Sequence, residues 1–365
     1  MQKKQVAVLD VGSSAVRAAV GERGINKTFI LKARKDFEYD GFTDGAFLST
    51  ESLKRAVSEA CAFISSSVGE TDGVFVGVPG AFTRVEVKES QISFPRKKRV
   101  TDEDVDALFD AAFVMSSAKS TLINRSAVAY ELGDGRRLAN PVGEYSEILK
   151  GKLSFITCDN YFTGLLRPVM HASGYKNAEF VSVPLAEAMY LIDAETRDRT
   201  AIILDVGYIT STFSLLQGDG IIFEHSFDYG GGYITAALTR RFSVDFPVAE
   251  RLKRKINLSR LPEEGAEILQ IGNNSFSAEA ARSVIRASLD ILCEEISDCI
   301  DKSGYIIPEY VPVTLTGGGI SYIRGAKEHV SGRIGMVVEE VAPKIPLGFK
   351  PTEASLYSLL DLTLG

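Results

Sequence analysis

The chain has 365 residues, of which 45% are hydrophobic and 24% are charged, as is ordinary for a soluble globular protein. This length favours two or more domains. The formal net charge of −7 provides no overall basic field, so we expect no nucleic acid partner. One basic run, residues 96–99, is expected in a solvated loop, with contact to anionic lipid as the alternative.

The four cysteines and three histidines indicate no metal-binding or disulfide framework. Cys61, Cys158, Cys293 and Cys299 form no C-x-x-C pair, and the histidines are scattered. We expect the cysteines as free thiols in a reducing cytoplasm. No apolar stretch approaches the ~20 residues that span a bilayer, and the N-terminus does not have the pattern of a signal peptide.

The first predicted element is a buried strand that recurs later in the chain. Residues 6–9 are apolar, end in Asp10-Val11-Gly12-Ser13-Ser14 and are followed by a second apolar run. Residues 201–204 are also apolar, end in Asp205-Val206-Gly207 and are followed by a second run after Thr210. The glycine marks a tight turn between two strands in each copy. Two copies in separate halves predict two domains of related design.

Helices are predicted between and after these strands. Residues 51–68 have helical spacing, residues 101–104 resemble a capping box that opens a helix through residue 115, and residues 278–301 form a long amphipathic pattern. Strands alternate with helices after residue 150, so the predicted fold class is α/β or α+β with more than one sheet.

Two glycine clusters follow strand-like segments. Gly230, Gly231 and Gly232 precede a predicted helix at residues 234–242, and Gly317, Gly318 and Gly319 follow an apolar run and precede helix-forming sequence. Glycines allow backbone to approach a ligand closely, and a helix N-terminus attracts anions. The spacing matches neither the Rossmann nor the P-loop fingerprint.

These motifs together indicate a nucleotide site. Hydroxyls and amides of the two hairpin turns can hold a polyphosphate from both sides, and the triple-glycine turn can receive the nucleoside. Asp10 and Asp205 can hold Mg²⁺ through water, because Mg²⁺ prefers oxygen ligands and keeps several waters.

The same motifs resemble those of the actin, Hsp70 and sugar-kinase superfamily. Residues 10–14 and 205–210 look like its two phosphate loops, and residues 315–319 look like its adenosine motif. Glu250 and Lys253 resemble the pair that approaches the ribose and adenine in bacterial actins. The resemblance implies ATP and Mg²⁺ as cofactors and an actin-like two-domain fold with ribonuclease H-like halves.

Within the superfamily, the chain resembles the FtsA family over nearly its whole length. The segments at residues 77–80, 100–105, 140–143 and 156–158 look like the inserted subdomain of FtsA. The resemblance implies a first domain core at residues 1–85, with 158–199 and 346–365, and an inserted subdomain at 86–157. It implies a second core at 200–240, with 306–345, and a small outer subdomain at 241–305. The pilus protein PilM shares this architecture and is the nearest competitor.

The FtsA resemblance also implies a function. It implies a polymerising adaptor that links FtsZ to the division site, in the cytoplasm at the inner face of the cell membrane. The FtsZ tail is expected to bind the small outer subdomain, where Arg251, Lys253, Arg254 and Lys255 provide basic charge; a simply solvated helix is the equal alternative. The alternatives are a PilM-like component of a pilus system and, less favoured, a small-molecule kinase.

The sequence departs from the family on the phosphate side. Tyr208 and Ile209 stand where two glycines are expected, Ala15 stands where a lysine is frequent, and Val183 replaces a glutamate that positions water. Large side chains are expected to crowd the γ-phosphate or to forbid the turn. We therefore expect nucleotide binding with at most weak ATPase activity, and a pseudo-ATPase scaffold is the alternative. No catalytic residue is predicted.

The C-terminal segment also departs from FtsA. Residues 353–364 are apolar and contain no lysine or arginine, which favours packing onto the first domain over membrane binding. Membrane attachment, if present, is expected through a missing C-terminal segment or through a partner.

Overall fold

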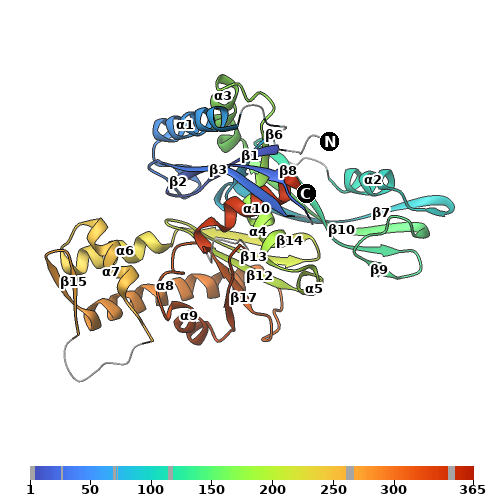
Figure 1. The fold of residues 1–365 in the computed structure, drawn as a ribbon. Helices are drawn as coiled ribbons and strands as arrows, with labels where there is room; N and C mark the ends of the chain where they lie inside the picture. Colours follow the sequence, from blue (N-terminus) through green and yellow to red (C-terminus); the bar gives the residue numbers. More distant parts are fainter. Residues whose placement is uncertain are drawn as a thin grey trace.

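The computed structural model describes residues 5–25, 28–68, 71, 73–113, 118–259, 267–343 and 350–365. Its two halves each contain a five-stranded sheet with the same strand order and directions (Figure 1). The first sheet has the order β3-β2-β1-β6-β11, and the second has the order β14-β13-β12-β17-β18. In each sheet the first three strands are antiparallel and the last two run parallel to the central strand. The expectation of two related halves is confirmed.

The strands of the first sheet are β1 (Gln5–Val11), β2 (Ala15–Arg23), β3 (Phe29–Glu38), β6 (Gly73–Val78) and β11 (Glu179–Ser182). Those of the second are β12 (Ala201–Val206), β13 (Ser211–Gln217), β14 (Gly220–Phe227), β17 (Val313–Thr316) and β18 (Val338–Glu340). The central strands β1 and β12 are apolar on both faces because helices cover both faces of each sheet.

Alternate residues of β1 enter two different cores. Ala7, Leu9 and Val11 pack with α1 (Thr50–Val68) and α3 (Asn160–Ala172). Val6 and Val8 pack on the other face with α4 (Val183–Leu191) and α10 (Ala354–Leu364). The two-residue period of a strand explains this division. The predicted packing of the C-terminal segment onto the first half is confirmed.

Helix α4 lies between the two sheets (Figure 1). Val183 and Ala186 pack towards the first sheet, whereas Leu185 and Ala188 pack with Ile203 of β12 and its neighbours. A helix that is apolar on nearly all sides is typically buried, as here. The two halves of the molecule are therefore joined through a buried central helix.

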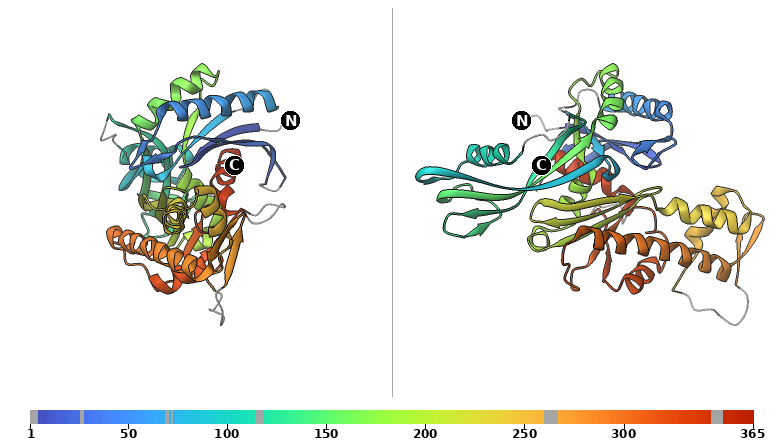
Figure 2. Two further views of the ribbon diagram at one scale, coloured as in Figure 1. Left: turned by 90° about the vertical axis from the view of Figure 1, so that its left-hand side faces the viewer. Right: turned by 180° about the vertical axis from the view of Figure 1, so that it is seen from behind.

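A third sheet projects from the first half to one side of the molecule (Figures 1 and 2). It consists of β7 (Thr83–Arg99), β8 (Ser120–Leu132), β9 (Arg137–Leu138) and β10 (Tyr145–Asp159), in the order β7-β10-β8-β9. Helix α2 (Asp102–Ala112) packs on it and begins with the predicted capping box of Thr101 and Asp104. The basic run at residues 96–99 lies at the end of β7, so the expectation of a loop is wrong.

The opposite side of the molecule carries a mainly helical region of the second half (Figure 2). It contains α6 (Gly231–Phe242), α7 (Phe246–Lys255), β15 (Ile268–Ile271), β16 (Asn274–Ser277) and α8 (Ala278–Ser303), and α9 (Ala326–Ile334) packs on α8. The predicted helices at 51–68, 234–242 and 278–301 are confirmed. Residues 114–117, which include the predicted end of α2, lie outside the described residues, and the domain bounds remain predictions.

The remaining elements are short: β4 (Phe42–Thr43), β5 (Ala46–Phe47), η1 (Gly80–Phe82), α5 (Ala194–Arg197) and η2 (Pro351–Glu353). All four cysteines are buried free thiols. Within the ranges given above, no helix combines the length and apolar character needed to cross a bilayer.

Candidate functional site

The two aspartate-tipped turns meet at the centre of the molecule. In the first, the Gly12 amide donates to the Ala15 carbonyl at 3.0 Å, and in the second the Gly207 amide donates to the Thr210 carbonyl at 3.1 Å. The Ile209 amide then donates to Ser13 Oγ at 3.1 Å and so joins the two turns directly. The expectation that both turns face one shared cleft is confirmed.

The second turn accommodates its two large side chains. Among the described residues, Asp44 and Ser243 are the non-glycine residues with positive φ, so Tyr208 and Ile209 adopt ordinary backbone angles. The Tyr208 ring lies 6.3 Å from the Phe246 ring, on the side of α7. The expectation that these side chains forbid the turn is therefore wrong, while crowding of a phosphate by Ile209 remains a prediction.

Asp10 is buried and has two partners inside the cleft. Its Oδ2 accepts from Arg17 Nη1 at 3.1 Å and from Ser355 Oγ at 2.6 Å. Arg17 lies two residues after Ala15 on β2, so both side chains leave the strand on the same face. A cation therefore lies in the cleft beside the first turn, although the usual lysine position is occupied by Ala15. The strand alternation was the signal that could have located it.

Two further carboxylates in the cleft have no donor. Neither Asp205 nor Glu187 has a hydrogen-bond or ion-pair partner in the part of the chain that the structure describes. Burial, together with the nearby Asp10 charge, raises the pKa of Asp205 to about 6. Burial, followed by Asp205 and Asp10, raises the pKa of Glu187 well above its ordinary value. A cation in the cleft would stabilise both ionised carboxylates.

The geometry is compatible with Mg²⁺ held through water. The described residues contain no group of three His, Cys, Asp or Glu side chains arranged to hold a metal ion directly. Mg²⁺ usually keeps several of its waters in protein sites, so carboxylates at a greater distance still fit it. The unpartnered Asp205 and the partly neutralised Asp10 are consistent with that expectation.

The triple-glycine turn closes tightly around Asp205. Gly317 has φ of +86°, and a Cβ built there would lie 2.1 Å from Asp205 Oδ1. A Cβ at Gly318 would lie 2.2 Å from the Thr352 side chain, and the Gly319 amide donates to the Val206 carbonyl at 2.7 Å. Helix α9 starts only at Ala326, so the expected helix N-terminus directly after this turn is wrong.

The other glycine cluster supports the second turn from behind. The Gly231 amide donates to the Gly207 carbonyl at 3.0 Å, and the Gly232 amide donates to the Tyr208 carbonyl at 2.7 Å. A Cβ at Gly230 would lie 2.6 Å from the Gly207 oxygen. The Gly231 and Gly232 amides already donate to protein carbonyls. The cluster therefore contributes to the site by fixing the position of the second turn.

Lys253 and Glu250 form a pair at the α7 side of the cleft. Lys253 is 3% exposed, and its Nζ lies 2.8 Å from Glu250 Oε2 and donates to the Gly231 carbonyl at 2.9 Å. Thr235 Oγ1 also donates to Glu250. Lys253 therefore faces the cleft and is not part of an exposed basic face, which corrects that part of the expectation. Arg251, Arg254 and Lys255 remain exposed.

These elements enclose a cavity of about 560 Å³, which is within the usual range for ligand pockets. Eleven of the predicted nucleotide-site residues line it: Asp10, Gly12, Ser13, Ser14, Asp205, Gly207, Thr210, Glu250, Lys253, Gly317 and Gly318. The other four, Gly230, Gly231, Gly232 and Gly319, lie behind the lining. Four residues that no sequence motif predicts also line it: Arg17, Tyr39, Glu187 and Ser355.

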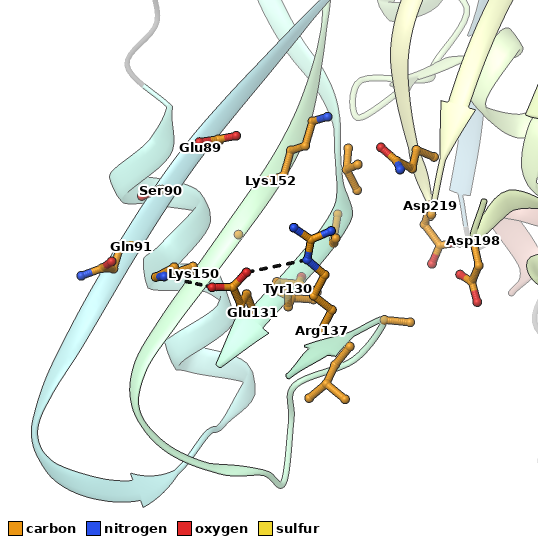
Figure 3. A pocket seen from close by; sticks show the side chains of 18 of the residues that line it. Glu89, Ser90, Gln91, Tyr130, Glu131, Arg137, Lys150, Lys152, Asp198 and Asp219 are labelled. Carbon is orange, nitrogen blue, oxygen red and sulfur yellow. Dashed lines mark hydrogen bonds and ion pairs between the residues drawn. The ribbon is translucent and has the colours of Figure 1, made fainter. Parts of the chain in front are cut away.

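A second cavity of about 1010 Å³ lies between the projecting sheet and the β13–β14 hairpin (Figure 3). None of the predicted site residues lines it. Its lining carries charges of both signs, and Glu131 contacts both Lys150 at 2.9 Å and Arg137 at 3.7 Å. This cavity therefore has no clear preference for a cation or an anion.

Comparisons with known proteins agree with this geometry. A family model described as Type IV pilus assembly protein PilM matches residues 180–352. The cell division protein FtsA of Streptococcus pneumoniae is 22% identical over 72% of this chain and 58% of that protein, so the match spans less than two thirds of its length. FtsA of Neisseria meningitidis is 21% identical over 94% of this chain and 85% of that protein.

Solved structures match over almost the whole chain. A PilM–PilN type IV pilus biogenesis complex has a TM-score of 0.63 at 18% identity and covers 98% of both chains. MreB 5 of Spiroplasma citri bound to AMPPNP has a TM-score of 0.54 at 12% identity and covers 98% of this chain and 95% of that chain. The chain has the actin-like fold, and its resemblance to FtsA is confirmed.

Proposed function

We propose that this chain is an FtsA-like, nucleotide-binding adaptor that polymerises and links FtsZ to the division site at the inner face of the cell membrane. The observation that supports nucleotide binding is the shared cleft. In it, the buried Glu187 and the half-buried Asp205, which have no donors among the described residues, face an arginine and two hairpin turns. The similarity to FtsA along most of the chain supports the adaptor part.

The cleft residues have distinct proposed roles. The Ser13, Ser14 and Thr210 hydroxyls and the Arg17 guanidinium would hold phosphate oxygens, with Gly12 and Gly207 allowing close backbone approach. Asp10 and Asp205 would hold Mg²⁺ through water, and the bound ion would neutralise phosphate charge. Glu250, Lys253 and residues 317–319 would hold the nucleoside.

A titration of the full chain with fluorescent ATP, with and without Mg²⁺, tests the nucleotide part. We expect saturable binding that unlabelled ATP displaces. Absence of saturable binding at millimolar nucleotide would leave only a scaffold. Phosphate release is expected to be slow or absent, because Val183 stands where the family has a water-positioning glutamate.

Binding to a synthetic FtsZ C-terminal peptide tests the adaptor part. We expect the acidic tail to contact the exposed cations of α7, so Arg251→Glu should weaken binding. Lys302→Glu, which reverses a charge at the other end of the same region, is the matched control. Equal binding by both variants would contradict this docking site. Sedimentation with ATP tests filament formation, and co-flotation with vesicles tests membrane attachment.

A PilM-like role is the second candidate. The PilM family model and the match to the PilM–PilN complex favour it. Binding to the tail of a pilus membrane protein, without binding to the FtsZ peptide, would select this role and reject the division role.

A further inference from the structure

We propose that Glu187 is a third carboxylate of the cation site, and that it holds a hydrated divalent cation together with Asp10 and Asp205. This inference rests on the proposed nucleotide function. It adds a residue that no sequence motif assigns, and it makes α4 part of the binding machinery.

The position of Glu187 in the fold is unusual for a charged residue. It is the single charged residue of α4, and most of the other side chains of this helix pack into the cores on both sides. It is 2% exposed, yet it lines the same cavity as Asp10, Asp205 and Arg17. Val183, one helical turn earlier, is apolar and packs in the core with β11 and α10, and it also borders the cavity. The carboxylate that α4 presents to the cleft is therefore one turn further along than expected.

The surroundings of Glu187 point to a missing cation. Arg17 and Ser355 both donate hydrogen bonds to Asp10. Glu187, in contrast, has no donor among the residues that the structure describes. Burying a carboxylate without a partner costs several kcal/mol, so it is usually paired or bound to a metal. Asp205, the other carboxylate without a donor, is its largest electrostatic neighbour. One cation between them would satisfy both.

The carboxylates come from three different parts of the chain. Asp10 ends β1 of the first half, Asp205 ends β12 of the second half, and Glu187 lies on the helix between them. Because no three of the described acidic side chains are placed for direct ligation, the ion must keep its waters. Mg²⁺ retains its waters more readily than Ca²⁺, so Mg²⁺ is the expected ion.

The test compares Glu187→Gln with Glu224→Gln in the full chain. Glu224 is a second desolvated carboxylate, but it does not line the cavity. Isothermal titration would measure the affinity for Mg²⁺ in the presence of ADP, and the affinity for ADP in EDTA. We expect Glu187→Gln to weaken Mg²⁺ binding by about 10- to 100-fold, as is usual for outer-shell metal partners, and to leave ADP binding in EDTA unchanged. Glu224→Gln should change neither.

A second probe tests whether the ion is hydrated. Cobalt(III) hexammine does not exchange its six ammonia ligands. It therefore binds only to a site whose protein groups contact the ligands of the ion and not the metal itself. We expect it to compete with Mg²⁺ in the wild type and to bind more weakly to Glu187→Gln. If Mg²⁺ binds and cobalt hexammine does not, the outer-sphere site is wrong.

The remaining outcomes separate this inference from the proposed function. Equal Mg²⁺ affinity of wild type and Glu187→Gln, or no Mg²⁺ binding to the wild type with or without ADP, would overturn the role of Glu187. Mg²⁺ binding that depends on Glu187 in a chain that binds no nucleotide would keep the site and reject the nucleotide function. Thermal unfolding without Mg²⁺ provides the folding control, because removal of a buried charge should not lower the stability of Glu187→Gln.

Discussion

Arg17 is the residue that changes the chemistry expected of the first turn. Its guanidinium is held in the cleft by Asp10, beside the backbone of Gly12. If it contacts phosphate, Arg17→Met should weaken ATP binding by about 10- to 100-fold, which corresponds to one lost charged hydrogen bond of about 1.5–3 kcal/mol. Adenosine binding should not change. Displacement titrations with both ligands measure the difference.

Arg17→Lys is the matched variant for this prediction. It keeps the charge but loses the planar fork, so part of the affinity for ATP should return. If Arg17→Met weakens ATP and adenosine equally, Arg17 maintains the shape of the cleft and does not contact phosphate.

Glu224 provides a pH prediction outside the cleft lining. Burial raises its pKa to about 7 from 4.5, although Thr83 donates a hydrogen bond to it. Between these two values the folded protein holds a proton that the unfolded chain has released. The stability contributed by this group is therefore present at pH 4.5 and is lost as the pH rises to about 7.

Glu224→Gln should remove this pH dependence, because glutamine resembles the protonated acid. We expect the variant to be more stable than the wild type by up to about 2 kcal/mol at pH 8, with little difference at pH 5. Urea denaturation at both pH values measures this. An identical pH dependence of the two proteins would show that Glu224 titrates normally.

At the scale of elements, the glycine turn after β17 leaves no room for a side chain. Gly317→Ala would place a Cβ 2.1 Å from Asp205 Oδ1 at a φ of +86°, so it should destabilise the fold by about 3 kcal/mol or more. Gly332→Ala in α9 is the control, since a Cβ there meets nothing within 4 Å.

In a helix, alanine is favoured over glycine, so Gly332→Ala should stabilise by about 0.5–1 kcal/mol. Denaturant midpoints of the two variants therefore should shift in opposite directions. Similar shifts would mean that the turn relaxes to admit the methyl group.

The elements also show how far the sequence alone reaches. Strand–turn–strand repeats around Asp10 and Asp205 were predictable because local turn chemistry and apolar runs determine them. Contacts between elements that are distant in the sequence could not be predicted in this way. Lys253 has the spacing of an exposed helix cation, and only the approach of α6 buries it against Gly231. The burial of Glu187 likewise depends on the two sheets that enclose α4, and these sheets come from distant parts of the chain.

At the scale of the whole molecule, several hydrogen bonds join the two halves around the cleft. The Ile209 amide donates to Ser13, the Asp44 amide donates to Asp228 at 2.7 Å, and Thr83 donates to Glu224. A phosphate between the turns would compete for the Ile209 amide. We therefore infer that ligand binding and the separation of the halves are coupled at this bond.

The contact between Asp44 and Asp228 brings one carboxylate from each half close to the other. A hydrogen bond to Asp228 and repulsion by its charge raise the pKa of Asp44, so the repulsion between the two side chains grows as the pH rises. Asp44→Asn removes the repulsion, keeps the backbone donor and suits the positive φ of 49°. We expect the variant to hold the two halves together more strongly at pH 7, so the Ile209 amide, which donates to Ser13, should exchange with deuterium more slowly than in the wild type. In acid, where the carboxyl groups of the wild type are protonated, the two proteins should exchange alike after correction for intrinsic rates. A difference that persists at low pH would show that Asp44 acts through the turn conformation and not through its charge.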